Sequence, residues 1–180
     1  MNKIQTLLIL TVSLSVQSFA LGDECQNKAI NTDLVVKCFR TLYFKEADKL
    51  WGFLNKEKER LAIKGDKKSI SEYLVIANVA GGNAEYMEYL NDFIETSIVK
   101  NTEEFMGSLL LLNKNTLASV FNILNQPIYA STQNLTKILE QYIKLAEYKS
   151  IRNEMTAAIV RYKKVLMRIE KARKKEAESW

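Results

Sequence analysis

Ser97 and Lys100 form a catalytic-looking pair in this sequence, in the tetrapeptide Ser-Ile-Val-Lys. In penicillin-recognising enzymes, a lysine one helical turn after a serine activates that serine as a nucleophile. There the serine opens a buried helix beside a sheet, and Ser-Asp-Asn and Lys-Thr-Gly motifs accompany it, which this sequence lacks. We therefore interpret Ser97 as a solvated serine and Lys100 as a cation near a helix C-terminus.

Three carboxylates, Glu85, Glu88 and Asp92, follow one another at spacings of three and four residues, so they share one helical face. Two carboxylates can supply the acid and the base of glycoside hydrolysis, but that reaction also needs a cleft and one carboxyl with a raised pKa. Such spacings are common on helix surfaces, where charges keep a protein in solution. We expect a solvated face rather than a hydrolytic site.

The sequence contains no histidine, which is the usual general base and a common zinc ligand. No Ser-His-Asp or Cys-His arrangement can therefore form. The sequence also lacks the glycine-rich loops that cradle the phosphates of nucleotides. We predict that the protein is not an enzyme and that it has no catalytic, cofactor-binding or metal-binding residues.

Cys25 and Cys38 are the only cysteines. Their spacing is not Cys-x-x-Cys, and no histidine is present to complete a metal site with them. In an oxidising compartment the simplest outcome is a disulfide, which stabilises a protein by about 3 kcal/mol for a loop of this size, because it lowers the entropy of the unfolded chain. We predict a Cys25–Cys38 disulfide that holds an N-terminal arm on the first helix.

The first 20 residues have the pattern of a secretory signal peptide. Lys3 gives a positive start, residues 4–16 are mainly apolar, and Ser18 and Ala20 place small residues where signal peptidase inspects the chain. A membrane anchor would need about 20 apolar residues, more than this run provides. We predict cleavage after Ala20, a periplasmic or secreted protein, and no integral membrane span in the mature chain.

From residue 32 onward, apolar residues recur at helical spacing, and one proline with six glycines is too few for a fold of many hairpins. We predict a single all-α domain over residues 21–180, either an irregular multi-helix bundle or a short HEAT-like stack of helical hairpins. The expected helices cover residues 32–44, 46–63, 69–79, 83–98, 105–112, 117–124, 135–145 and about 155–172.

Local signals predict where several helices begin and end. Ser69 and Glu72 have the spacing of a capping box, and Asn83 is placed to cap the helix after Gly81-Gly82. Pro127 lacks an amide hydrogen and is expected to end a helix before a loop over residues 129–132.

The segments over residues 105–112 and 117–124 are apolar on nearly all sides, so we expect them to form the centre of the core, with Leu110 and Phe121 buried. The other expected inward-facing residues are Leu34, Val35, Cys38, Phe39, Leu42, Leu50, Trp51, Phe53, Leu54, Leu61, Leu74, Ile76, Met87, Leu90, Ile94, Ile98, Leu135, Ile138, Leu139, Tyr142, Leu145, Met155, Ala158, Ile159, Tyr162, Val165, Leu166 and Ile169.

Positive charge is concentrated at the end of the chain. Residues 161–180 contain eight Lys or Arg residues and three Glu residues, a net charge of +5 that equals the net charge of the whole chain. This segment is either a surface for an anionic partner or a solvated helix end, since the tail from about residue 171 lacks the preceding apolar stripe. Nucleic acid is not expected, because aromatic residues do not alternate with the cations. The candidate surface consists of Arg161, Lys163, Lys164, Arg168, Lys171, Arg173, Lys174 and Lys175.

With its signal-like start, its early cysteine pair and a helical body of this size, the chain resembles small periplasmic all-helical immunity proteins. Residues 69–127 also resemble paired helices of HEAT type. The resemblance implies a non-catalytic module that binds a protein and inhibits a peptidoglycan-attacking effector. The alternative is a structural or adaptor protein of the bacterial cell envelope, whose partner is another envelope component.

Overall fold

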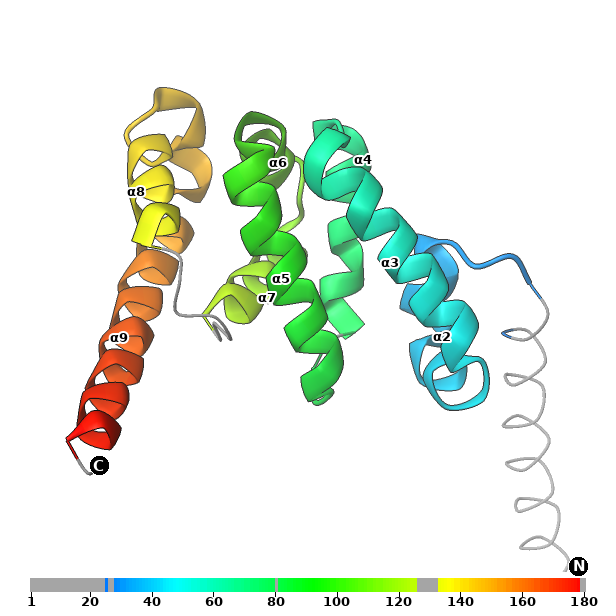
Figure 1. The fold of residues 1–180 in the computed structure, drawn as a ribbon. Helices are drawn as coiled ribbons and strands as arrows, with labels where there is room; N and C mark the ends of the chain where they lie inside the picture. The colour runs from blue at the N-terminus through cyan, green and yellow to red at the C-terminus, as the bar shows by residue number, and fades with distance from the viewer. Residues whose placement is uncertain (1–24, 26–27, 80, 126–132, 179–180) are drawn as a thin grey trace, which may run out of the picture. The chain divides into compact units, whose positions relative to one another are not determined.

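The computed structural model describes residues 25, 28–79, 81–125 and 133–178, and it confirms the predicted all-α fold (Figure 1). No β-strand occurs in these ranges, and no helix in them is both long enough and apolar enough to span a bilayer. Two 3-10 helices are present, η1 (Val75–Val79) and η2 (Ala146–Ile151). The α-helices are α2 (Thr32–Lys45), α3 (Ala47–Lys64), α4 (Lys67–Leu74), α5 (Ala84–Lys100), α6 (Thr102–Leu109), α7 (Lys114–Leu124), α8 (Gln133–Tyr142) and α9 (Arg152–Ala177).

The chain divides into two compact units, residues 1–55 and 56–180, with the division inside α3. The single domain expected over residues 21–180 stays a prediction. In the second unit, the α-helices range from 8 residues in α4 and α6 to 26 residues in α9. Such unequal lengths favour an irregular bundle over a stack of equal hairpins.

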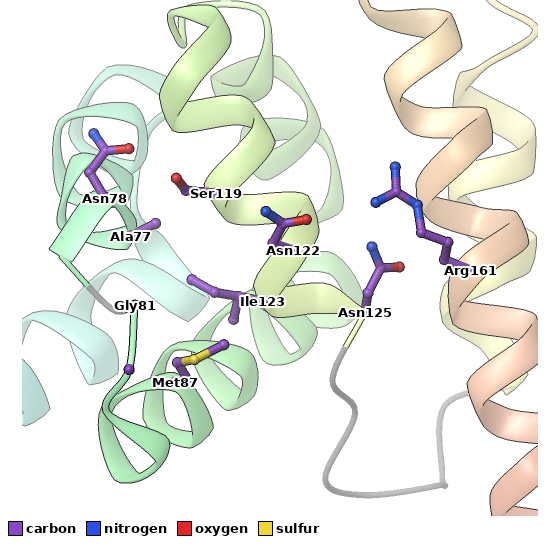
Figure 2. A pocket seen from close by; sticks show the side chains of 10 residues that line it. Ala77, Asn78, Gly81, Met87, Ser119, Asn122, Ile123, Asn125 and Arg161 are labelled. Atoms are coloured by element: carbon purple, nitrogen blue, oxygen red, sulfur yellow. The ribbon is translucent and has the colours of Figure 1, made fainter.

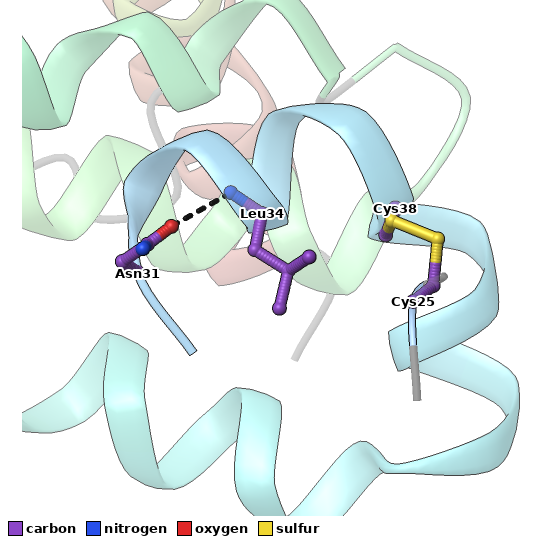
Figure 3. The surroundings of a disulfide bond; sticks show 4 residues. All are labelled: Cys25, Asn31, Leu34 and Cys38. Carbon is purple, nitrogen blue, oxygen red and sulfur yellow. Dashed lines mark hydrogen bonds between the residues drawn. A yellow bond between two sulfur atoms is a disulfide. The ribbon is translucent and has the colours of Figure 1, made fainter. Parts of the chain in front are cut away.

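In the first unit, α2 is held at its start by a side-chain cap and in its middle by a disulfide (Figure 3). The Oδ1 atom of Asn31 accepts a hydrogen bond from the backbone N–H of Leu34 at 2.9 Å, which satisfies one of the free amide groups of the first turn. Cys25 and Cys38 form the predicted disulfide, with their Cα atoms 5.6 Å apart and both side chains buried.

The expected inward faces of α2 and α3 are confirmed in part. Val35, Cys38 and Leu42 of α2 are buried, as are Leu50, Leu54 and Leu61 of α3. The remaining four expected residues are half-buried: Leu34, Phe39, Trp51 and Phe53.

The predicted capping box at Ser69 is wrong, because Asp66 caps α4 one turn earlier. The Oδ1 atom of Asp66 accepts from the backbone N–H groups of Lys68 and Ser69, each at 2.9 Å, and the Ser69 hydroxyl donates to Oδ2. These hydrogen bonds, led by the one from the Ser69 amide, lower the pKa of Asp66. Glu104 accepts from the backbone N–H of Lys67 at 2.7 Å, so α6 helps to satisfy the start of α4. The helix also ends sooner than expected, at Leu74, and η1 continues it.

In the second unit, α5, α7 and α9 each pack against several other elements. α4 packs against α6; α5 contacts α6, α7 and α8; and α7 also contacts η1 and α9, which packs on α8. Asn83 caps α5 as predicted, because its Oδ1 atom accepts from the backbone N–H of Tyr86 at 2.9 Å. Met87, expected to face inward, is half-buried, whereas Tyr86 and Phe93 of the same helix are fully buried.

The expectation of a core centred on residues 105–124 holds for most of that segment. The buried residues there include Phe105, Met106, Leu109, Leu117, Val120, Phe121, Ile123 and Leu124. Leu110 is the exception, since α6 ends at Leu109 and Leu110 is half-buried, while Leu111 is 55% exposed. Leu110, Leu111 and Leu112 lie in the turn that follows α6, so their side chains do not continue the buried face of that helix.

In α8 and α9, the buried residues lie toward the N-terminal part of the inward face that the sequence predicts. Leu135 and Leu139 of α8 are buried, but Leu145 lies past the helix end and is 45% exposed, contrary to the expectation. In α9, Met155, Ala158, Ile159 and Tyr162 are buried, whereas Val165, Leu166 and Ile169 are half-buried like Ile138 and Tyr142. Pro127 and the loop predicted over residues 129–132 lie outside the described residues.

Candidate functional site

Ser97 does not form a catalytic pair with Lys100. The Ser97 hydroxyl donates to the backbone carbonyl of Phe93 at 2.7 Å, and the side chain is 0% exposed. The expectation of a solvated serine is wrong, because a hydroxyl satisfied by its own helix can be buried at little cost. Lys100 is exposed in the last turn of α5, as expected.

The three carboxylates on α5 are not gathered in a cleft. Glu85 and Glu88 are exposed, and Asp92 forms a partly exposed ion pair with Lys58 of α3. The Lys58 Nζ atom also lies 5.1 Å from the centre of the Tyr89 ring. Asp92 and Tyr89 of α5 therefore both contact Lys58 of α3, within the second unit.

A cluster of tyrosines lies between α4 and α5. The hydroxyls of Tyr73 and Tyr89 are 3.0 Å apart, and the rings of Tyr86 and Tyr89 are stacked. Burial raises the pKa of Tyr73, Tyr86 and Tyr89, so these hydroxyls keep their protons at neutral pH and are not bases there.

One buried carboxylate links α5 to α9. Glu95 is 7% exposed, and its Oε1 atom accepts a hydrogen bond from the Tyr162 hydroxyl at 3.3 Å. The sequence does not identify this contact, because Glu95 lies on the side of α5 that the apolar pattern leaves ambiguous. In the ranges that the structure covers, no group of three or more His, Cys, Asp or Glu side chains is arranged to bind a metal ion.

The eight basic residues of the candidate surface lie on α9, and all of them are exposed. Lys163 forms an ion pair with Glu140 of α8, which neutralises part of this charge. Two apolar side chains on the same helix are also exposed, Val160 by 48% and Met167 by 61%. The second half of α9 is therefore basic and amphipathic, and its apolar stripe is only partly covered.

A pocket of about 540 Å³ lies in the second unit and includes Arg161 in its lining (Figure 2). Ser119, Asn122 and Asn125 follow one another at three-residue spacing along α7 and its C-cap, so they lie along one side of that helix. The lining residues are Ala77, Asn78, Gly81, Gly82, Met87, Ser119, Asn122, Ile123, Asn125 and Arg161. Arg161 extends from α9 toward Asn125 (Figure 2).

The side-chain amide of Asn125 is buried and makes no hydrogen bond with the described residues. Neither its nitrogen nor its oxygen is exposed, and neither has a hydrogen-bond partner among the described residues. A buried polar group in this state costs about 1–3 kcal/mol. The sequence analysis did not identify these pocket residues, although the three-residue spacing of Ser119, Asn122 and Asn125 is visible in the sequence.

Comparison of the chain with protein-family models, with curated proteins and with solved structures gives no match. The functional argument therefore depends on the chain's own residues: the basic half of α9, and the pocket whose lining includes Arg161.

Proposed function

We propose that this protein is a non-catalytic protein-binding module that acts outside the cytoplasm. The observation that carries the proposal is the second half of α9, where exposed cations accompany an incompletely covered apolar stripe. Val165, Leu166 and Ile169 can contribute apolar contact area, and the cations can attract an acidic partner over a distance of about 8–10 Å in physiological salt. The Cys25–Cys38 disulfide supports an oxidising compartment.

Ser97 is buried and Asp92 is paired with Lys58, so neither the serine–lysine pair nor the carboxylates of α5 are arranged as a catalytic site. This supports binding rather than catalysis as the activity to test first. The specific form we propose is a periplasmic immunity protein that inhibits a peptidoglycan-attacking effector. The second form is an adaptor of the cell envelope, which the same exposed surface on α9 would suit.

Capture of partners from cell-envelope extract tests this proposal. The variant changes Lys164, Arg168 and Lys171 of α9 to glutamate. A matched control changes Lys56, Lys64 and Lys100, which are exposed on α3 and α5, so both variants alter the net charge equally. We expect the α9 variant to lose at least about tenfold in affinity for a captured protein and the control to keep its affinity within about twofold.

The identity of the captured protein separates the two forms. A single toxin-like partner whose peptidoglycan degradation is blocked supports an immunity protein, and a multiprotein envelope assembly supports an adaptor. Turnover of peptidoglycan fragments by the isolated chain, abolished by Ser97→Ala with Glu88→Gln, would refute the proposal. Equal losses in the α9 variant and in the control would show that net charge, and not this surface, controls binding.

A further inference from the structure

The pocket beside α7 has a polar wall, an apolar wall and a guanidinium group (Figure 2). Ser119, Asn122 and Asn125 supply hydroxyl and amide groups, while Ala77 and Ile123 supply apolar surface. Its volume of about 540 Å³ lies within the range of sites that hold small ligands or short segments of chain. Exposed residues such as Asn78 and Asn122 at its edge leave it open to solvent.

The Asn125 amide indicates what kind of group would fill this pocket. Its nitrogen can donate hydrogen bonds and its oxygen can accept them in one plane, and both atoms are buried without a partner in the part of the chain that the structure describes. A peptide group offers the complementary acceptor and donor. Only an extended or irregular segment can present them, because a helix uses its backbone groups internally.

Arg161 indicates the charge of such a segment. Its guanidinium can donate two parallel hydrogen bonds to a carboxylate, the geometry that arginine favours. None of the described lining residues is acidic, so no carboxylate of the lining competes for Arg161. The neighbouring cations of α9, including Lys164 and Arg168, add to the attraction for a negative group.

We propose that this pocket binds an extended segment of a partner protein that contains an aspartate or glutamate. The Asn125 amide pairs with a backbone peptide group of the segment, Asn122 provides a further hydrogen bond, and Arg161 binds the side-chain carboxylate. This inference rests on the proposed function, and it names the chemistry of the partner at one position.

Selection from a displayed library of random linear peptides tests the proposal without a known partner. The probes are the exported, disulfide-bonded protein, Arg161→Gln, and Lys100→Gln as a control that makes the same charge change at an exposed position of α5, outside the pocket and outside the α9 surface. We expect the wild-type protein and Lys100→Gln to enrich peptides with an acidic residue at one position. Arg161→Gln should bind the selected peptides at least about tenfold more weakly.

Asn125→Leu tests the backbone contact separately, because leucine keeps the branched shape of asparagine but has no hydrogen-bonding groups. We expect it to weaken all selected peptides, while the unfolding midpoint of the protein stays the same or rises, since two unsatisfied buried atoms are removed. A fall in both peptide binding and the unfolding midpoint would show only a structural role for Asn125 and would overturn its part of the proposal.

Three other results would overturn the inference. If acidic residues are not enriched, or if Arg161→Gln enriches them equally, Arg161 is not the carboxylate site. If free acetate or an anionic peptidoglycan fragment competes fully with the peptides, the pocket recognises a carboxylate without a peptide backbone. If the extract yields a partner whose affinity Arg161→Gln and Asn125→Leu leave unchanged, the pocket inference fails while the proposed function stands.

Discussion

α5 and α9 are both long amphipathic helices of the second unit, yet the core covers them very differently. α5 buries residues from its first turn, at Tyr86, to its last, at Ile98. α9 buries residues only as far as Tyr162, and Val165, Leu166 and Ile169 are half-buried. Met167 and every residue from 170 to 178 are exposed. An apolar stripe on a helix is therefore buried in the core only where another helix packs over it.

The largest expected difference between the two helices concerns large side chains. Phe93 of α5 is 0% exposed, with its ring centre 4.9 Å from that of Tyr73. We expect Phe93→Ala to lower the free energy of unfolding by about 3–5 kcal/mol, because it removes apolar contacts and leaves a cavity. Met167→Ala on α9 should change it by less than about 0.5 kcal/mol. Urea denaturation of the oxidised proteins measures both changes. Equal losses of stability would show that the core covers α5 and the second half of α9 to the same degree.

The helix starts should also differ. Asn83 caps α5 through its side chain, whereas Ile151, the N-cap of α9, has no polar side-chain group that could accept a hydrogen bond. We expect Asn83→Ala to destabilise the protein by about 1 kcal/mol, since one amide of the first turn loses its acceptor. Asn83→Asp, which keeps an acceptor, serves as the control. A loss as large as that of Asn83→Ala would argue against capping as the cause.

Much of the fold was predictable from the sequence, because helical spacing, Asn83 and the cysteine pair are local signals. The contrast between α5 and α9 was not, since Val165, Leu166 and Ile169 continue the apolar spacing of α9 but are only half-buried. The capping-box spacing of Ser69 and Glu72 predicted Ser69 as the cap of α4, but Asp66, three residues earlier, is the cap. Leu110 and Leu145 are apolar but lie where helices end, so periodicity could not place them. The pocket combines α7 with Arg161 of α9, and sequence spacing within one helix does not reveal such a neighbour.

Alkaline pH tests the burial of Tyr148, which lies in η2 just before the start of α9. Burial, assisted by the neighbouring Glu147, raises the pKa of Tyr148 to about 12. The unfolded chain loses this proton near pH 10, before the folded protein does, so stability is full below pH 10 and falls as the pH rises toward 12. Tyr148→Phe should reduce this fall when unfolding midpoints are measured from pH 8 upward. An unchanged pH profile would show that Tyr148 ionises equally in both states.

The smallest expected effect is at the end of α9. Deletion of Lys171–Trp180 should change the free energy of unfolding by less than about 0.5 kcal/mol, because residues 171–178 are exposed. Thermal and urea unfolding of the shortened chain provide the measurement. A loss above about 2 kcal/mol would mean that this segment belongs to the folded core, and would remove its availability as a binding surface.

The rate of association with the captured partner, measured over a range of salt concentrations, tests the central claim that the second half of α9 is a binding surface. For the wild-type protein we expect the rate constant to fall as salt rises, because exposed charges steer the encounter. The variant with glutamate at Lys164, Arg168 and Lys171 should associate more slowly at low salt and show a flatter dependence, while the Lys56, Lys64 and Lys100 control keeps the wild-type slope. Identical salt slopes for the wild-type protein and the α9 variant would contradict the account.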